Sequence, residues 1–138
     1  MASIYKQFRF DLGAAQVWDR LRDFYALRER LVPGFVSECR AEPGARLLTF
    51  YNGLVAREVL VGLDDEHQRL SYAVVGGRAT HHQASVQVFE EAGGACRLIW
   101  ITDVLPDELA EPIGIMMDRG AADMQHTLKA GGSAPFAR

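Results

Sequence analysis

Along the first part of the chain, the spacing of apolar residues changes from two to three or four. Ile4, Phe8 and Phe10 occupy even positions, and this period of two predicts a half-buried strand over residues 4–10. After Gly13 the apolar residues recur at the spacing typical of a helix with one buried face, namely at Val17, Trp18, Leu21, Phe24, Tyr25 and Leu31. We therefore expect one or two short helices, ended by Pro33-Gly34.

The middle of the chain alternates between apolar runs and strong turn signals. These runs predict six strands, over about residues 35–40, 47–51, 54–63, 69–75, 82–90 and 97–105. Asn52-Gly53 lies between two of them, and Asn-Gly is the pair best able to adopt both positive φ angles of a two-residue hairpin turn. A two-residue hairpin is therefore predicted there.

Helical spacing returns near the C-terminus. Pro112 is a natural first residue of a helix, and the pattern continues to about residue 130, where Gly131-Gly132 is expected to end it. One strand, short helices, six strands and one long helix favour an α+β fold, with helices gathered on one face of an antiparallel sheet. We expect a single domain over residues 1–130 and a flexible tail over residues 131–138.

Composition narrows the class of protein. The chain has 138 residues, of which 49% are hydrophobic and 24% charged, as in one globular domain. A formal net charge of −3 without a dense basic run argues against nucleic acid as a partner. No stretch reaches the ~20 apolar residues that span a bilayer, and no apolar leader segment opens the sequence. We therefore expect a cytoplasmic protein; its oligomeric state is left open, a homodimer included.

Residues with metal or cofactor chemistry are sparse. The sequence has no Cys/His/Asp spacing for zinc or iron, no Gly-x-Ser-x-Gly elbow and no glycine-rich phosphate loop, so neither metal nor cofactor is expected. Cys39 and Cys96 are expected to be reduced and packed as small hydrophobic residues. His81 and His82 are adjacent in a strand, so they leave opposite faces and cannot share a metal ion. They are either rim residues or, for one of them, a proton-transferring group at a cavity mouth.

Several short segments also occur in a characteristic order. They are Val17-Trp18, Asp23-Phe24, Arg57-Glu58, Leu63-Asp64-Asp65, Arg69-Leu70-Ser71-Tyr72, and the run from Trp100 to Pro106. In this order, over nearly the whole chain, they resemble the START-like, helix-grip superfamily of polyketide cyclases/dehydrases, lipid-transfer domains and birch-pollen-allergen-type proteins. The resemblance implies a seven-stranded curved antiparallel sheet around the long C-terminal helix, with a ligand cavity between them.

Residues 57–77 are also similar to the matching stretch of the plant abscisic acid receptors, which share this fold. That likeness implies cavity-facing side chains at Glu58, Tyr72, Val74 and Ser85 of the sheet, and at Met116, Gly120 and Met124 of the helix. Two departures argue against abscisic acid itself. Ser37 stands where those receptors have a lysine for the hormone carboxylate, and their gate loop is shortened here to the Asn52-Gly53 hairpin.

Glu58 is the main candidate for chemistry. Strand parity puts Ala56, Glu58 and Leu60 on one face, although the opposite parity is also rich in apolar residues, which leaves an exposed Glu58 as the alternative. Burial raises the pKa of a carboxyl group, which would suit a general acid/base or an anchor for a ligand hydroxyl or amine. The inward stripe of the last helix is expected to be Ile113, Met116, Met117, Gly120, Met124 and Leu128, serving as core or as a deformable pocket wall.

These features favour a carrier or sensor that binds a small, mostly apolar molecule, of an aromatic or a polyketide- or lipid-like kind, between sheet and helix. One alternative is an enzyme of the cyclase/dehydratase kind that uses Glu58 as acid/base, although the divided pair of acid/base groups usual in such chemistry is missing. Another is a protein-interaction module with a closed core, which would show a filled interior and an exposed apolar patch elsewhere. We predict finally that Gly120 leaves room for a ligand, because glycine inside a helix costs about 1 kcal/mol relative to alanine.

Overall fold

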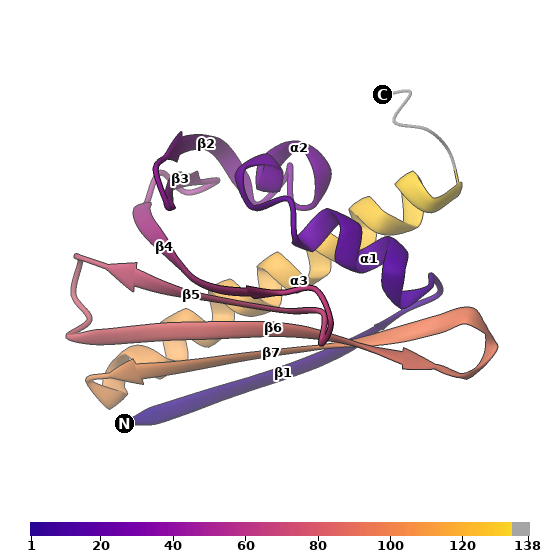
Figure 1. Ribbon diagram of the computed structural model, residues 1–138. Helices are drawn as coiled ribbons and strands as arrows, with labels where there is room; N and C mark the ends of the chain where they lie inside the picture. The colour runs from indigo at the N-terminus through magenta and orange to yellow at the C-terminus, as the bar shows by residue number, and fades with distance from the viewer. Residues whose placement is uncertain (134–138) are drawn as a thin grey trace.

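The computed structural model describes residues 1–133, and the side chains through residue 129. A seven-stranded sheet and a long C-terminal helix dominate it (Figure 1). The strands are β1 (Ala2–Phe10), β2 (Val36–Glu42), β3 (Ala45–Phe50), β4 (Val55–Asp64), β5 (Arg69–Val75), β6 (His81–Glu91) and β7 (Ala95–Leu105). The helices are α1 (Ala14–Leu21), η1 (Phe24–Ala26), α2 (Leu27–Arg30), η2 (Ala92–Gly94), η3 (Asp107–Leu109) and α3 (Ala110–Ser133).

The sheet is antiparallel throughout, with the strand order β1-β7-β6-β5-β4-β3-β2. The β4–β5 ladder changes register between Leu60 and Gly62, so Val61 is an extra residue on β4. A bulge of this kind bends its strand and increases the local twist. Figure 1 shows the result: β4 turns away from β5 and carries β3 and β2 out of the plane of the other strands. The curved antiparallel sheet predicted from the sequence is confirmed.

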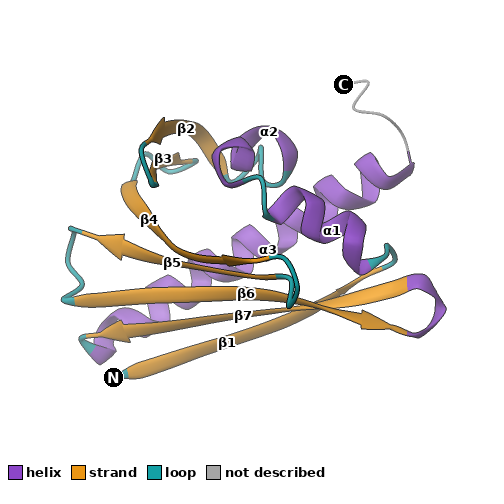
Figure 2. Cartoon of the chain, in the orientation of Figure 1, coloured by secondary structure: helices purple, strands orange, loops and turns teal. Residues whose placement is uncertain are grey.

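The helices lie on the concave side of this sheet. Figure 2 shows α3 crossing the sheet diagonally, with α1 and α2 close to its C-terminal half. The buried residues of α1 are Ala14, Val17, Trp18 and Leu21, which share one helical face. Together these elements enclose the core between sheet and helices.

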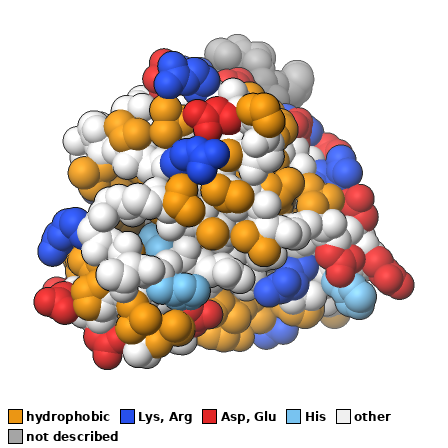
Figure 3. All heavy atoms as spheres, turned by 60° about the vertical axis from the view of Figure 1, so that its left-hand side comes forward, with side chains coloured by type: hydrophobic (Ala, Val, Ile, Leu, Met, Phe, Trp, Pro, Cys, Tyr) orange, Lys and Arg blue, Asp and Glu red, His pale blue; other side chains and the backbone are white. Residues whose placement is uncertain are grey.

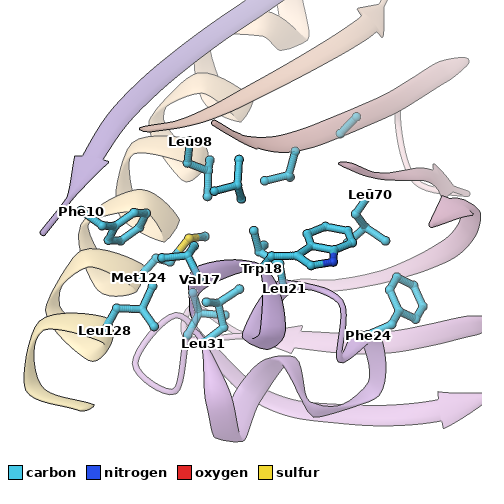
Figure 4. Packing of buried hydrophobic residues seen from close by; sticks show 14 of the residues in the cluster. Phe10, Val17, Trp18, Leu21, Phe24, Leu31, Leu70, Leu98, Met124 and Leu128 are labelled. Atoms are coloured by element: carbon cyan, nitrogen blue, oxygen red, sulfur yellow. The ribbon is translucent and has the colours of Figure 1, made fainter. Parts of the chain in front are cut away.

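The core is continuous from the sheet to α1 and α3. Side chains from α1 and α3 point toward those of β5 and β7 in Figure 4, where Val17, Leu21, Leu70, Leu98 and Met124 are labelled. Val17 and Leu98 are fully buried, and Cys96 is also buried as a free thiol. No helix among the described residues is long and apolar enough to cross a membrane.

Three local predictions need correction. The hairpin after β3 has three loop residues, because Phe50 N–H donates to Leu54 C=O and only Gly53 takes a positive φ, of 87°. Asn52 keeps a negative φ, as in a loop that ends in a glycine bulge. Helix α3 begins at Ala110, before Pro112, and extends through Gly131-Gly132 to Ser133. The predicted flexible tail falls largely on residues 134–138, outside the described residues.

Candidate functional site

A small cavity of about 60 Å³ lies between the concave face of the sheet, the α1–α2 region and α3. Space for one water molecule requires about 10–15 Å³, so the cavity has room for only a few. Its wall contains two charged residues, Arg46 and Glu58, within an otherwise largely apolar lining. The lining is formed by Leu21, Leu27, Leu31, Val32, Phe35, Val36, Arg46, Leu48, Phe50, Glu58, Leu70, Tyr72, Val86, Trp100, Gly120 and Met124.

Strand register places the polar residues of this wall. Arg46 of β3 lies directly opposite Glu58 of β4, and residues directly opposite in an antiparallel pair project to the same face. Tyr72 of β5 and Trp100 of β7 reach the cavity from farther along the same concave surface. Glu58 is therefore buried on the concave side, at 6% exposed, and Ala56 and Leu60 of the same parity are half-buried.

Arg46 and Glu58 form a buried ion pair. The Nε and Nη2 nitrogens of Arg46 donate to Oε1 of Glu58 over 2.9 and 2.7 Å, and Arg46 is 4% exposed. Its Nη1 donates to the carbonyl oxygen of Phe24 over 2.8 Å, and the guanidinium lies 4.0 Å from the centre of the Phe24 ring. Both bonds to the carboxylate end on Oε1, and no hydrogen bond among the described residues reaches Oε2.

Tyr72 supplies the second polar group. The indole Nε1–H of Trp100 donates to the Tyr72 hydroxyl oxygen over 3.2 Å, and the Arg46 guanidinium lies 5.5 Å from the centre of the Tyr72 ring. The hydroxyl donates to none of the described residues. Burial, reinforced by the nearby Glu58 carboxylate, raises the pKa of the Tyr72 phenol. The phenol is therefore a neutral hydrogen-bond donor over the physiological range.

Helix α3 contributes Gly120 and Met124 to the wall, but the position of a side chain at Gly120 is already occupied. A Cβ atom at Gly120 would lie 3.1 Å from Cε2 of Phe35 and 3.3 Å from Cη2 of Trp100. Two aromatic rings thus occupy the room that the glycine leaves. The expectation that Gly120 makes room directly for a ligand is corrected: it allows Phe35 and Trp100 to pack against the helix.

The remaining expected site residues lie outside the cavity lining. Ser85 pairs with Ser71 and Ile101, on the face opposite to Val86, because successive residues of a strand alternate between faces. The prediction that Ser85 faces the cavity is therefore wrong. Val74 and Met116 are partly buried against the core, Ile113 is half-buried and Met117 is buried, but none of the four lines the cavity.

The histidines do not combine with this site. His81 is exposed. His82 is half-buried on the other face of β6, which is the face of the cavity-lining Val86, but it lies four residues before Val86 and does not line the cavity. Burial, with a smaller contribution from His81, lowers the pKa of the His82 imidazole. His67 pairs with Asp64 in the exposed turn after β4, and this carboxylate raises its pKa.

Arg46 is the functional candidate that sequence reasoning missed. An arginine in a strand is usually assigned to the solvent face. Its parity was nevertheless informative, because Arg46, Leu48 and Phe50 alternate along β3 and all three line the cavity. When one arginine has the same parity as the apolar residues of a strand, the pattern therefore predicts that the arginine is buried or has an acidic partner on the next strand.

Comparison with known proteins gives the same fold. Similar solved structures include an uncharacterised protein from Bacillus thuringiensis, with a TM-score of 0.80, 18% identity, and coverage of 91% of this chain and 97% of that chain. Norcoclaurine synthase from Thalictrum flavum has a TM-score of 0.73 and 17% identity over 96% of both chains. A START superfamily protein from Mycobacterium smegmatis has a TM-score of 0.67 and 14% identity, over 91% of this chain and 98% of that chain.

At these identities the structural matches show the fold alone. Comparison with curated proteins gives no match. The family described as polyketide cyclase / dehydrase and lipid transport matches residues 1–130. The chain therefore belongs to this family.

Proposed function

We propose that this protein is a carrier or sensor that binds a small, mostly apolar molecule with one hydroxyl group. One observation carries the proposal: within an apolar cavity wall, Oε2 of Glu58 accepts no hydrogen bond from the described residues, and the Tyr72 hydroxyl donates none. The family includes lipid transport proteins, which agrees with an apolar ligand.

The burial of the ion pair supports a role beyond folding. Moving a charged side chain out of water costs several kcal/mol, and apolar residues of similar volume often give equal or higher stability. Arg46 and Glu58 are 4% and 6% exposed, so both bear this cost. A ligand that donates a hydrogen bond to Oε2 of Glu58 would explain why charged residues are present in this wall.

The polarity of the site favours a neutral hydroxyl on the ligand. A hydroxyl group donates one hydrogen bond and accepts up to two, so it can donate to Glu58 and accept from Tyr72. A ligand carboxylate would meet the negative charge of Glu58. A ligand ammonium would add a charge to a pair that is already balanced, and it would offer Tyr72 no acceptor.

An enzymatic role is the less favoured candidate. The structural neighbour norcoclaurine synthase is seen with dopamine and hydroxybenzaldehyde, both hydroxylated aromatic molecules, but 18% identity carries no activity over to this chain. Glu58 is engaged in the ion pair with Arg46, over 2.7 Å, and burial raises the pKa of the Tyr72 phenol. Glu58 is the one carboxyl group among the cavity-lining residues, and these include no histidine, so the divided acid/base pair usual in such chemistry is missing from the described wall.

A pure protein-interaction module is also less favoured. Such a protein would combine a filled interior with one broad exposed apolar patch. Here the interior keeps a cavity of about 60 Å³ with polar groups in its wall. On the face shown in Figure 3, hydrophobic side chains are divided by polar and charged ones.

A pair of probes that differ by one hydroxyl group tests the proposal. The wild-type protein should bind 2-naphthol more tightly than naphthalene, by about tenfold, the effect expected of a hydrogen bond to a charged group. Fluorescence titration gives both affinities. Thermal unfolding gives an independent measure, since a ligand at 100 times its Kd adds about 2.7 kcal/mol of stability.

The matched control replaces the ion pair with apolar residues of similar size. Arg46→Met/Glu58→Leu should keep the fold and the affinity for naphthalene but lose the preference for 2-naphthol. Equal affinity of the wild type for both probes would contradict the hydroxyl anchor. Failure of either probe, and of a wider set of apolar alcohols, to stabilise the wild type would contradict ligand binding itself.

A further inference from the structure

The cavity is too small for an organic ligand as it stands. Its volume of about 60 Å³ accommodates only a few water molecules, whereas an apolar cavity that binds benzene has a volume of about 150 Å³. Binding therefore requires one wall to move. The wall that moves should be the one with the least regular hydrogen bonding to the rest of the fold.

Most of the wall belongs to elements that resist displacement. Strands β3 to β7 are paired on both sides, and α3 is one helix that packs against β1. The connection from α2 to β2 is different, because residues 33–35 belong to neither a helix nor a strand. Pro33 and Gly34 are exposed, while the ring of Phe35 lines the cavity at 7% exposed. Phe35 is thus the cavity-lining residue of this irregular and otherwise exposed segment.

One carboxylate fastens this segment to α3. Oδ2 of Asp123 accepts the backbone N–H of Gly34 over 2.9 Å and that of Phe35 over 3.1 Å. On the other side, the backbone C=O of Phe35 accepts the N–H of Tyr51, in the hairpin between β3 and β4, over 2.9 Å. The Phe35 N–H is shared with the carbonyl oxygen of Val32, over 3.2 Å. Among the described residues, Asp123 is thus the side chain of α3 that hydrogen-bonds the 33–35 segment.

Gly34 is adapted to this contact. A Cβ atom at Gly34 would lie 2.7 Å from Oδ1 of Asp123, so any other residue would push the carboxylate away from the two N–H groups. The ring of Phe35 meanwhile packs on Phe50, at 5.1 Å between centroids, and on the half-exposed Tyr51, at 6.0 Å. Phe50 lines the cavity and Tyr51 is exposed, so the Phe35 ring lies between the cavity wall and an exposed residue.

We propose that Phe35 is the movable wall of the ligand cavity, and that Asp123 is the latch that holds it closed against α3. Release of the two N–H groups lets the ring swing outward and joins the cavity to the space that it vacates. Phe35 thereby sets the size of molecule that the cavity admits. This rests on the proposed ligand binding for its purpose, but the motion itself can be measured without a ligand.

Amide hydrogen exchange measured by NMR tests the latch. In Asp123→Ala and in Gly34→Ala, the amide at position 34 should exchange about tenfold faster than in the wild type, the change expected when a hydrogen bond to a charged group is lost. The amide of Phe35 should also exchange faster, but by less, because it keeps the carbonyl oxygen of Val32 as an acceptor. Asp118→Ala is the control, because Asp118 is exposed on the same helix and pairs with half-buried Lys6 of β1. It should leave these two amides unchanged.

Stopped-flow uptake of N-phenyl-1-naphthylamine, a neutral apolar fluorophore, tests the wall. Uptake should be faster in both latch variants and in Phe35→Ala, where the ring is absent, and unchanged in Asp118→Ala. Wild-type exchange rates in both latch variants would overturn the latch. Uptake that is equally fast in the wild type and in Phe35→Ala would overturn the movable wall while leaving ligand binding intact. Faster exchange with no uptake by any variant, Phe35→Ala included, would instead overturn the ligand cavity.

Discussion

Arg46 on β3 and Glu58 on β4 face each other directly across the sheet, and both are almost fully buried, at 4% and 6% exposed. Two guanidinium nitrogens converge on one carboxylate oxygen, over 2.9 and 2.7 Å. Loss of one partner leaves the other charge buried without compensation, whereas loss of both leaves an apolar wall. Single and double substitutions should therefore differ sharply.

Glu58→Leu alone should lower the free energy of unfolding by about 3–5 kcal/mol, because the Arg46 charge is then buried and unpaired. Arg46→Met/Glu58→Leu should recover most of that loss. Urea denaturation of the three proteins gives the comparison. Glu42→Leu is the control, since Glu42 of β2 pairs with Arg57 of β4 over 2.9 Å and both side chains are partly exposed. An effect of Glu58→Leu as small as that of Glu42→Leu would contradict the compensating role of the pair.

Gly120→Leu should lower the free energy of unfolding by about 1–3 kcal/mol, because the added side chain meets two aromatic rings. The nearest ring atoms would lie only 3.1 and 3.3 Å from the new Cβ. Gly114→Ala is the control within the same helix, since its Cβ would meet Ile4 at an ordinary 3.6 Å. That change should stabilise the protein by up to about 1 kcal/mol through helix propensity. Unchanged or higher stability of Gly120→Leu in urea would show that the site has free space after all.

Asp65 should make the stability of the protein depend on pH in the acid range. The Arg22 guanidinium, followed by the indole N–H of Trp18, holds the pKa of the Asp65 carboxyl below its ordinary value of 3.8. A carboxyl group whose pKa is lower in the folded state stabilises the fold above its unfolded pKa, and this stability is lost as the pH falls through the folded pKa. The wild type should exceed Asp65→Asn in stability near neutral pH, and the gap should close below pH 3.8.

Urea denaturation at a series of pH values measures that gap. Asp11→Asn is the control, because the Asp11 side chain is 95% exposed and lies 3.4 Å from Arg9. Its stability curve should run parallel to that of the wild type. A constant gap between the wild type and Asp65→Asn down to pH 3 would contradict the prediction.

The sequence predicted the fold because its apolar periodicity is a direct consequence of burial on one face. Strand β5 was predicted over the residues that it occupies, 69–75, and the long helix was placed within α3. The hairpin at Asn52-Gly53 was predicted in place but with the wrong loop length. Asn-Gly fits a two-residue turn and also a three-residue loop, in which only the glycine needs a positive φ. Pairing between the flanking strands decides between them, and no local pattern carries that information.

The site was harder to predict for two separate reasons. Ser85 was assigned to the cavity by family likeness, although the buried Ala84, Val86 and Val88 of β6 already have the opposite parity. Local periodicity was the better guide there. The sequence also did not show which part of the inward stripe of α3 lines the cavity. Of the residues in that stripe, only Gly120 and Met124 do so. How far a cavity extends depends on tertiary packing, here on Phe35.

Tyr72→Phe should remove one hydroxyl group and leave the aromatic packing in place. The indole N–H of Trp100 then loses its acceptor, and the free energy of unfolding should fall by about 1–3 kcal/mol at neutral pH. The same variant should lose part of the preference for 2-naphthol over naphthalene, because the Tyr72 hydroxyl is the proposed donor to the ligand. Urea denaturation and fluorescence titration give the two effects on one sample.

Stability measurements at alkaline pH test whether the Tyr72 phenol is buried in the folded state. Burial raises the pKa of Tyr72 above the ordinary value of 10.0, so the folded state resists an ionisation that the unfolded state undergoes. The contribution of the hydroxyl to stability is complete below pH 10 and declines as the pH rises toward the folded pKa. The difference in unfolding free energy between the wild type and Tyr72→Phe should therefore shrink above pH 10. Tyr25→Phe is the control, because Tyr25 is 42% exposed. Parallel curves for the wild type and Tyr72→Phe up to pH 11 would mean that solvent reaches the phenol. The Tyr72 hydroxyl would then not be the dry hydrogen-bond donor on which the proposed selectivity depends.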